Sequence, residues 1–534
     1  MAKTGVRLAG DHGIAMTGLG SVNAITESPE RSDGTFILMP GWQSNAKKKG
    51  LRTVAFHVSL VGRSDLSGEI YRQIRQAILD GRLRPGERLS PTRELAAALR
   101  VSRSTVTVAY ENLLAEGFAT SQTGAGTFVS HQLEAKRPAS KARRPPVRAI
   151  AVRGVWQTIS PPTTFDRADF DFRTGLPDAS LFPHRAWRRV VARALRSREM
   201  TEGVYENPAG NWDLRVAITR HIGISRSVSA SPDDILVTSG TQQALDIIAR
   251  VLLEPGDVIA VEKPGYLPPK YLFKALGARV IGVPVDSEGL VVEALPARAR
   301  AVYVTPSHQY PLGVAMSLSR RRALLAWAER NNAVVVEDDY DSEFRFGGRP
   351  LEPLQALDST GRVVYVGTFS KTLLPTLRLG FMVVPPALRE AAIKAKHITD
   401  WHTTTIVQSA LARFIDEGAF ARHIRRMSRI YGERHQTLTA AIKRNFGDYL
   451  DLVPSSTGLH VAAYARGASV GHIDAIVSRA FDLGVAVHLF GVGEDPQAGI
   501  MLGYGAIETP RIAEGLQRVR RCFDERLSRH LKAA

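Results

Sequence analysis

The hydrophobic positions of residues 67–117 fall at helical spacing and predict three helices. Within 67–80, apolar residues recur at Ile70, Ile74 and Ile78 after a Ser N-cap at 67. A second, short helix is predicted over 91–99, and a third begins at a Ser N-cap at 102 and ends before a Gly at 117. Two helices joined by a turn of about three residues form a helix-turn-helix. β-forming residues then flank Gly124 and Gly126, which predicts a hairpin and completes the α+β element order of a winged helix.

Beyond residue 165 the pattern changes to short β-branched runs that alternate with helical segments. The runs lie at 233–240, 257–265, 301–307, 333–341 and 362–371, and helical segments at 241–254 and 319–331 separate some of them. This alternation predicts an α/β domain with a mostly parallel sheet, in which ligands gather at the carboxyl ends of the strands.

The positive charge of the chain is concentrated toward the N-terminus. The 534 residues carry a formal net charge of +18, and residues 51–150 account for +8 of it, with 16 Lys and Arg against 8 Asp and Glu. The basic segment suggests an anionic partner for the N-terminal region. A single cysteine, Cys522, excludes an intrachain disulfide framework and fits a reducing compartment. No apolar run approaches the ~18 residues of a membrane span.

Two segments have little periodicity and bound the predicted domains. Residues 1–55 are rich in Gly, Ser and Thr, and we expect a disordered leader or an over-extended reading frame, since Met39 could also initiate. Residues 131–163 contain KRPASKARRPPVR, in which Pro and mutually repelling basic residues disfavour a helix, and we expect an interdomain linker. The predicted domains are therefore 56–130 and 164–534.

The start of the third helix carries short hydroxyl side chains and one Arg. Such residues can approach phosphates and base edges at small entropic cost, and Arg93, early in the second helix, could clamp a phosphate. The residues at the helix start are Ser102, Arg103, Ser104, Thr105 and Thr107. Taken alone, each could equally be a cap or a solvated side chain. The ordered series of helices and hairpin around them favours DNA binding.

A lysine after the last apolar run gives the sharpest chemical signal. Lys371 lies in GTFSKTLLPTLRLG, just beyond a strand, where burial and neighbouring cations would lower its pKa and favour the neutral amine that Schiff-base formation requires. Ser370 and Arg378 supply a hydroxyl and a guanidinium for a phosphate. Thr241 and Gln242 open a helix whose free N–H groups can bind the same phosphate.

A carboxylate and a tyrosine on a neighbouring strand complete the set. Asp338 and Tyr340 are two residues apart and so point to the same face. A carboxylate against a pyridine nitrogen keeps that ring protonated, and a Tyr hydroxyl can bond its phenolic oxygen. Singly, a Lys at a strand end is most often solvated, and EDDYD could be an acidic loop. In combination these groups specify pyridoxal 5′-phosphate, and they indicate no metal site.

Two parts of the chain resemble known families. Residues 60–130 resemble the GntR-type winged-helix domain through the run GERLSPTRELAAALRVSRSTVTVAYENLLAEGF and the Gly-flanked wing. Residues 165–530 resemble the fold-type I aminotransferases, through the motifs VTSGTQQALD, EKPGY, TPSHQYPLG, EDDYDSEFR and GTFSKTLLPTLRLG.

Each resemblance implies roles for particular residues. The first implies that operator DNA is contacted by Arg93, Arg103, Ser104, Thr105 and the wing Gly124. The second implies pyridoxal 5′-phosphate in a Schiff base with Lys371, with Asp338 at the pyridine nitrogen and Tyr340 at the phenolic oxygen. It further implies that Tyr266 stacks on the ring and that the phosphate is held by Thr241, Gln242, Ser370 and Arg378.

Two positions depart from the aminotransferase pattern. The usual Asn-Pro-x-Gly is here Tyr310-Pro311-Leu312-Gly313, and an Arg that usually grips the substrate carboxylate is here Met501. Loss of that guanidinium removes a positioning contact and argues against an efficient general transaminase. Another Arg could serve in its place.

The whole layout resembles the MocR/GabR-type regulators over residues 60–530. The resemblance implies a bacterial, cytoplasmic and nucleoid-associated transcription factor that forms a head-to-tail homodimer and binds operator DNA. It implies a large domain that senses an amine, an amino acid or pyridoxal 5′-phosphate itself, with at most vestigial transaminase activity. Two alternatives stay open: a working aminotransferase with an incidental basic N-terminus, and a GntR repressor whose large domain only dimerises.

Overall fold

The structure, a computed structural model, describes residues 35–38, 57–60, 65–131, 150–159, 168–196, 202–347, 352–491 and 498–527. The chain divides into two compact units, residues 1–150 and 151–534, and each is described by itself. The predicted leader lies outside the described residues except for strand β1 (Thr35–Leu38), which pairs antiparallel with β2 (His57–Leu60). Of the predicted linker, residues 132–149 and 160–163 also lie outside them, whereas Arg153 donates to the carbonyl of Ala275 within the larger unit.

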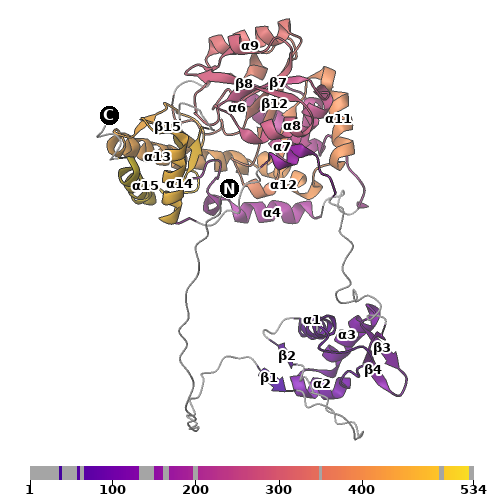
Figure 1. The fold of residues 1–534 in the computed structure, drawn as a ribbon. Coiled ribbons are helices and arrows are strands. Elements are labelled where there is room, and N and C mark those ends of the chain that lie inside the picture. Colours follow the sequence, from indigo (N-terminus) through magenta and orange to yellow (C-terminus); the bar gives the residue numbers. More distant parts are fainter. Residues whose placement is uncertain are drawn as a thin grey trace, which may run out of the picture. The chain divides into compact units, whose positions relative to one another are not determined.

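The smaller unit is the winged helix that the sequence predicts (Figure 1). Helices α1 (Leu66–Leu79), α2 (Thr92–Leu99) and α3 (Arg103–Ala115) precede a hairpin of β3 (Ala119–Gln122) and β4 (Gly126–Val129). The apolar positions at helical spacing meet in one core, which includes Ile70, Ile74, Leu95, Leu99, Val106 and Leu113. Burial of these side chains is what turns three marginal helices into a stable domain.

The first helix starts differently from its prediction. Asp65, not Ser67, is the N-cap of α1, and its Oδ1 accepts from the Gly68 N–H at 3.1 Å. An aspartate at this position also places negative charge at the positive end of the helix dipole. Ser67 therefore lies inside the first turn. The third helix starts as predicted, because the Ser102 hydroxyl accepts from the Thr105 N–H at 3.1 Å.

An eight-stranded, mostly parallel sheet forms the centre of the larger unit. The strand order is β6-β13-β12-β11-β10-β7-β8-β9, and only β13 and β9 run antiparallel to their neighbours in this sheet. Five of the strands match the predicted runs: β6 (Ile235–Thr238), β7 (Val258–Lys263), β10 (Ala299–Val304), β11 (Val334–Asp339) and β12 (Val363–Thr368). The other three are β8 (Arg279–Asp286), β9 (Gly289–Leu290) and β13 (Gly380–Val383).

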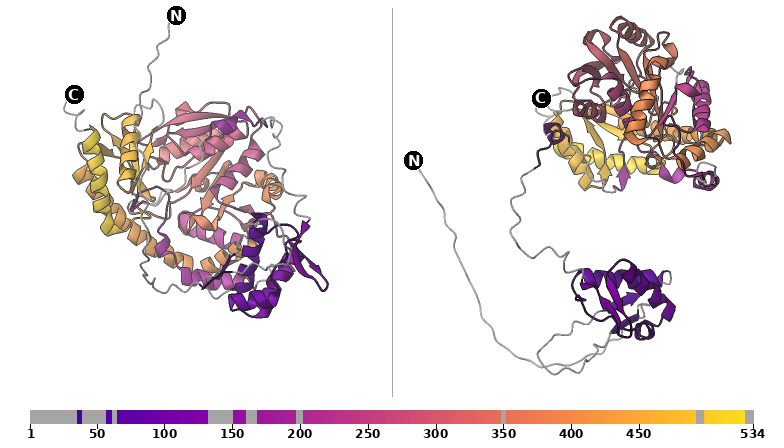
Figure 2. Two further views of the ribbon diagram at one scale, coloured as in Figure 1. Left: turned by 60° about the horizontal axis from the view of Figure 1, so that its bottom comes forward. Right: turned by 90° about the vertical axis from the view of Figure 1, so that its right-hand side faces the viewer.

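Helices cover both faces of this sheet, as Figure 2 shows from two sides. Alternate residues of one strand divide between the two layers: Val364 and Val366 of β12 face one layer, and Tyr365 faces the other. The first layer contains α7 (Thr241–Leu252), α8 (Leu267–Ala275) and α11 (Pro386–Asp400). The second contains α4 (His184–Ala194), α6 (Trp212–Arg226), α9 (Leu318–Arg330) and α12 (Thr405–Asp416). The result is the α/β architecture with a mostly parallel sheet that the sequence predicts.

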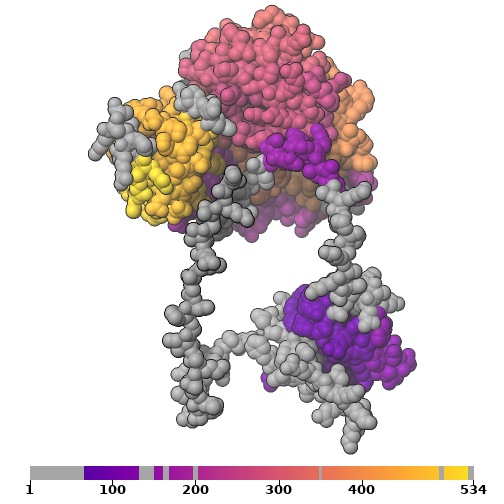
Figure 3. Space-filling view, in the orientation of Figure 1, coloured from indigo at the N-terminus to yellow at the C-terminus, as the bar shows by residue number. Residues whose placement is uncertain are grey.

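A second lobe follows the long helix α13 (Ala419–Asn445). Its antiparallel sheet has the order β14-β15-β18-β17 and packs against α13, α14 (Val470–Asp482) and α15 (Ile512–Leu527). Figure 3 shows this C-terminal lobe, coloured yellow, beside the bulk of the larger unit. The strands are β14 (Leu450–Leu452), β15 (His460–Ala465), β17 (His488–Phe490) and β18 (Gly499–Gly503). Among the described helices of both units, none is long and apolar enough to cross a membrane.

The core of the winged helix generates a stability prediction. Leu113 of α3 is fully buried, whereas Val108 of the same helix is 44% exposed. We expect Leu113→Ala to lower the unfolding free energy of the smaller unit by about 2–5 kcal/mol, because truncation removes buried area and leaves a cavity. The matched Val108→Ala change should cost no more than about 0.5 kcal/mol. Native-state hydrogen exchange of the α1 and α3 amides in the full chain measures both, and equal effects would contradict this packing.

Candidate functional site

A pocket of about 490 Å³ lies at the carboxyl ends of the central strands, between the eight-stranded sheet and the second lobe. This is the edge of an α/β sheet where ligands are expected. The pocket is lined by all eight cofactor-binding residues predicted from sequence, which are Thr241, Gln242, Tyr266, Asp338, Tyr340, Ser370, Lys371 and Arg378. They come from segments up to 137 residues apart, so the fold has brought the predicted set together.

Lys371 lies directly after β12, in the turn where the sequence predicts it. Its Nζ donates to the carbonyl of Gly175 at 2.8 Å. Gly175 has φ +77°, and a Cβ there would lie 2.7 Å from the same Nζ, so a side chain at this position would displace the amine. Burial lowers the pKa of Lys371 below its ordinary value, and the nearby Arg378 acts in the same direction, against Asp341 and Asp338. This environment raises the fraction of neutral, nucleophilic amine.

Asp338, at the end of β11, has one satisfied and one unsatisfied oxygen. The Tyr303 hydroxyl donates to Oδ2 at 2.8 Å, whereas the buried Oδ1 has no donor among the described residues. Burial raises the pKa of Asp338 to about 7, and the charge of Asp339 adds to that shift, while the Tyr303 hydrogen bond and Lys371 oppose it. A buried acceptor without a donor is costly. A protonated ring nitrogen would supply both the missing donor and a positive charge.

A cradle for a phosphate forms where β6 gives way to α7. Gly240 is the N-cap of α7 with φ +86°, so the first N–H groups of the helix have no side-chain cap. The Arg378 Nη2 donates to the carbonyl of Ser239 at 2.9 Å, and a Cβ at Gly240 would lie 3.0 Å from that nitrogen. Helix N–H groups, a guanidinium and the nearby Ser370 hydroxyl are together suited to a dianion. The residues present therefore fit the phosphate, the ring nitrogen and the aldehyde of pyridoxal 5′-phosphate.

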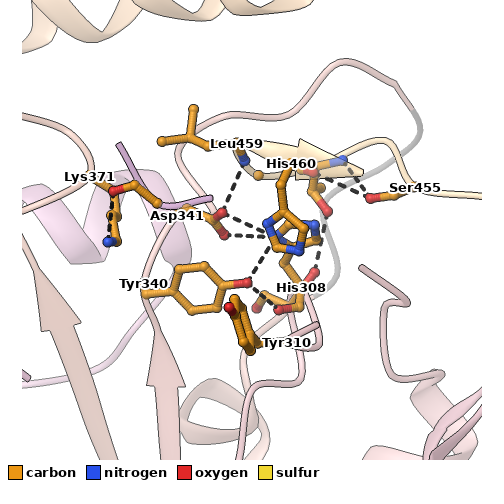
Figure 4. Close-up of polar contacts among 12 residues, drawn as sticks. His308, Tyr310, Tyr340, Asp341, Lys371, Ser455, Leu459 and His460 are labelled. Atoms are coloured by element: carbon orange, nitrogen blue, oxygen red, sulfur yellow. Dashed lines mark hydrogen bonds and ion pairs between the residues drawn. The ribbon is translucent and has the colours of Figure 1, made fainter. Parts of the chain in front are cut away.

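The hydroxyl of Tyr340 already has partners inside the protein (Figure 4). It donates to the carbonyl of His308 at 2.9 Å and lies 3.1 Å from His308 Nδ1, which in turn lies 3.1 Å from both oxygens of Asp341. Asp341 also accepts from the Leu459 N–H, and His460 Nε2 lies 3.0 Å from the Pro311 carbonyl oxygen. Contact with a phenolic oxygen would thus require the Tyr340 hydroxyl to turn away from His308.

Several residues lining the pocket were not named as site residues from the sequence. Thr174 and Gly175 precede the large sheet, and Tyr303 and Thr305 lie at the end of β10. Tyr303 and Thr305 are two apart, so the same-face argument that found Asp338 and Tyr340 could have found them. Tyr310 also lines the pocket, although the sequence marked it only as a departure from Asn. His460 and His488 come from the second lobe, and no spacing in the sequence connects them to Lys371.

The predicted DNA-binding residues divide into exposed and internally bonded side chains. Arg93, Arg103, Ser104 and Gly124 are exposed, and Gly124 forms the tip of the wing with φ +79°. The Thr107 hydroxyl donates to the Arg103 carbonyl at 3.0 Å, a bond within the helix. The hydroxyls of Ser104 and Thr105 lie 2.7 and 2.8 Å from the exposed Ser102 cap. Arg93, Arg103 and the wing are therefore the groups most available to a partner, with Arg103 Nε also 3.4 Å from the Thr92 hydroxyl.

Comparisons with known proteins agree with both units. Residues 66–129 match the family described as Bacterial regulatory proteins, gntR family, and residues 176–468 match Aminotransferase class I and II. The chain is 38% identical over 468 residues to the probable rhizopine catabolism regulatory protein MocR of Rhizobium meliloti, covering 85% of this chain and 93% of that protein. It is 33% identical over 462 residues to the HTH-type transcriptional regulator YhdI of Bacillus subtilis, covering 86% and 96%.

A solved structure gives the same result for the larger unit. The crystal structure of alpha-aminoadipate aminotransferase from Thermus thermophilus aligns with a TM-score of 0.61 and 30% identity, over 67% of this chain and 93% of that one. That protein was crystallised in complex with N-(5'-phosphopyridoxyl)-L-leucine.

The raised pKa of Asp338 predicts a pH-dependent stability difference. Because the folded protein holds the proton of Asp338 up to about pH 7 and the unfolded chain releases it near its ordinary pKa, wild-type stability falls as the pH rises from 5 to 8. Asn cannot ionise and can still accept from Tyr303. We expect the unfolding free energy of cofactor-free Asp338→Asn, measured relative to that of wild type, to rise by about 2–3 kcal/mol between pH 5 and pH 8.

Urea unfolding at the two pH values measures this difference. The exposed Asp474→Asn change serves as the control, and its unfolding free energy relative to wild type should be the same at both pH values. An Asp338→Asn curve that stays parallel to wild type across this range would show that Asp338 titrates normally.

Proposed function

This chain belongs to the MocR-type transcriptional regulators, which join a gntR-family winged helix to an aminotransferase class I and II domain, and we propose that its larger unit binds pyridoxal 5′-phosphate and thereby controls operator binding by the smaller one. The DNA-reading module is proposed to span 56–130, and the sensor module 164–534. We place the regulator in the bacterial cytoplasm, at the nucleoid.

The unpartnered Oδ1 of Asp338 is the observation that carries the cofactor proposal. An acceptor that is buried in a pocket and has no donor among the described residues is explained by a bound cation or N–H group. The cofactor supplies an aldehyde that captures amines and a ring that withdraws electrons from them. Asp338 would hold the ring nitrogen protonated, Lys371 would be the covalent attachment point, and the phosphate would be held by Thr241, Gln242, Ser370 and Arg378.

Tyr266 is proposed to cover the ring. It lines the same pocket and makes an edge-to-face contact with Tyr310, with 5.3 Å between the ring centroids. Tyr266 is 38% exposed, which leaves its ring accessible from the pocket. The aromatic pair would exclude water from one side of the cofactor and hold its plane.

We infer that the chain regulates and does not turn over amino acids efficiently. Met501 occupies the position where the aminotransferase pattern has a carboxylate-binding Arg, and it is buried among apolar side chains. Without that contact a captured amino acid is not held in the orientation that proton transfer requires. Any transaminase activity of this domain is proposed to be vestigial.

An exposed aromatic patch supports assembly into a head-to-tail homodimer. Tyr205 is 73% exposed and stacks on Trp401, itself 42% exposed, with ring centroids 4.4 Å apart. Ile398, 80% exposed, lies on α11 near the same Trp. The hydroxyl of Thr403, two residues beyond Trp401, lies 3.5 Å from the hydroxyl of Ser239, which is beside the phosphate cradle. Exposed apolar surface of this kind marks an interface, and a second copy would cover it next to the pocket.

The proposed effector is an amine, an amino acid or the cofactor itself. A ligand can shift operator binding only by as much as it favours one arrangement of the dimer over another. A pocket built from both lobes of the larger unit is suited to this, because closing the lobes on a ligand changes their packing.

The attachment of the cofactor is tested by changing Lys371. We expect Lys371→Ala to lose the visible absorbance band of the bound cofactor and the mass increase after borohydride reduction, because no amine remains to form the bond. Lys394→Ala removes an exposed Lys that is paired with Glu390, and it should keep both signals. A Lys371→Ala protein that keeps the band and the mass increase would refute the assignment of Lys371, whereas a wild-type protein with neither signal would favour a large domain that only dimerises.

The DNA-reading surface is tested by Arg103→Ala. Loss of an exposed guanidinium at the start of α3 should weaken binding to DNA upstream of its own gene by about 10–100-fold at fixed salt. If Arg103 contacts a phosphate, the salt dependence should also fall by about one unit of slope. Arg72→Ala, whose guanidinium pairs with Asp65 and Glu69 on α1, should change affinity little. Fluorescence anisotropy measures both, and equal affinities for the two variants would contradict the proposed surface.

A further inference from the structure

One wall of the cofactor pocket belongs to the antiparallel sheet of the second lobe. His460 on β15 and His488 on β17 line the pocket, and β18 lies between these two strands. Met501 of β18 pairs directly with Ala462 on one side and with His488 on the other. Directly paired side chains lie on the same face of a sheet, as do side chains two apart along a strand. Met501 therefore shares the face of His460 and His488.

The environment of Met501 on this wall is apolar. Met501 is 4% exposed and packs in a cluster with Leu312, Val453, Ala462 and Phe490. Tyr310, which lines the pocket, packs against the same cluster. Met501 is not itself among the residues that line the pocket, so thioether and hydrocarbon fill the space beside the two His residues and supply no donor for an anion.

The cationic groups around the pocket are engaged elsewhere. Arg173 is bound bidentately to Asp171, with Nε to Oδ1 at 2.8 Å and Nη2 to Oδ2 at 2.5 Å, so its charge is already balanced. Arg378 lies at the phosphate cradle, and Lys371 is the proposed attachment point. Apart from these three, no Arg or Lys lines the pocket among the described residues.

The two imidazoles of the wall do not replace the missing guanidinium. Burial lowers the pKa of His488, with Arg173 acting in the same direction and Asp171 against it. Burial also lowers the pKa of His460 well below its ordinary value. Both rings are therefore neutral at neutral pH. A ligand carboxylate against this wall would be buried without a counter-charge.

Hydroxyl and imidazole groups are what the wall offers to a ligand. The Thr174 hydroxyl lies 3.1 Å from His488 Nδ1 and 3.4 Å from the Tyr310 hydroxyl. Each hydroxyl can both donate and accept. A neutral polar group of a ligand could join this chain of bonds, whereas a carboxylate could only accept from it.

We propose that the effector of this pocket is a primary amine that carries hydroxyl groups and no carboxylate. The proposal rests on the proposed cofactor function and names the ligand class of the same site. Lys371 leaves as the free amine when the ligand's amine takes its bond, so one carbon–nitrogen bond forms as one breaks, and no oxidant is needed. His488 and Thr174 contact the ligand, Met501 keeps the face beside His488 apolar, and the amine anchors the ligand.

Matched pairs of ligands test the selectivity in the cofactor-loaded full chain. L-Alaninol and L-alanine differ in one group, as do serinol and serine, and each is titrated against the visible band of the bound cofactor. We expect the amino alcohols to shift the band at concentrations at least about tenfold lower than the amino acids, because burial of an uncompensated carboxylate costs more than 1.4 kcal/mol. Anisotropy of labelled operator DNA, measured with the same ligands, should follow the same order.

A substitution at the centre of the wall should reverse the preference. Met501→Arg supplies a guanidinium. We expect it to strengthen the binding of L-alanine at least about tenfold relative to that of L-alaninol, measured as the ligand concentration that shifts the visible band. Met501→Leu keeps the size and apolar character of the side chain and should retain the wild-type order.

The outcomes separate this proposal from the one it rests on. A chain that shows no visible band and no reducible adduct with Lys371 overturns the cofactor function. A chain that shows the band but responds to L-alanine and L-alaninol at equal concentrations overturns the ligand class alone. The wild-type comparison decides the matter even where Met501→Arg does not fold.

Discussion

Asp338 is held at the end of a strand that is buried on both faces, and one of its oxygens has no donor among the described residues. The surrounding side chains reduce the energetic cost of burying this carboxylate. Tyr303 satisfies the other oxygen, Lys371 lies close enough to oppose the raised pKa, and Asp339 is neutralised separately by Arg226 at 2.8 Å. A buried carboxylate of this kind destabilises the empty pocket and stabilises a cationic ring inside it. Stability is thereby exchanged for binding, as is common at functional sites.

The topology of the larger unit explains why these groups meet. Parallel strands end at one edge of the sheet, so Asp338 after β11, Lys371 after β12 and the helix start after β6 converge there, although β13 separates β6 from β12. The second lobe then closes the pocket with His460 and His488, and the Arg434–Asp178 ion pair at 2.7 Å links α13 to the segment that precedes α4. Because the pocket has walls from both lobes, a ligand that bridges them acts on their packing as well as on the cofactor.

Local signals in the sequence were sufficient for the winged helix and for the side chains that line the pocket at the ends of the central strands. Helical spacing found Ile70 and Ile74, and the two-residue spacing of Asp338 and Tyr340 found a shared face. The N-cap at Asp65 was missed because Ser67 offers an equally good local signal, and only the observed φ and hydrogen bond of Asp65 decide between them. The role of Tyr340 at the phenolic oxygen stays a prediction, and its hydroxyl donates to the His308 carbonyl in this structure. His460 and His488 were out of reach, because their strands meet only through separate antiparallel pairing with β18, which depends on a long-range register.

The two departures from the aminotransferase pattern, Tyr310 and Met501, lie in one place in the fold. Tyr310 packs against the cluster that contains Met501, and its hydroxyl reaches toward Thr174. In the proposed function, a phenol in place of an amide and a thioether in place of a guanidinium turn the wall from one that orients a carboxylate into one that accepts neutral polar groups. Lys371, Asp338 and the phosphate cradle are unaffected by either change. The proposed function needs this combination: a sensor joined to a DNA-binding domain requires the chemistry that captures an amine and does not require the contacts that turn capture into catalysis.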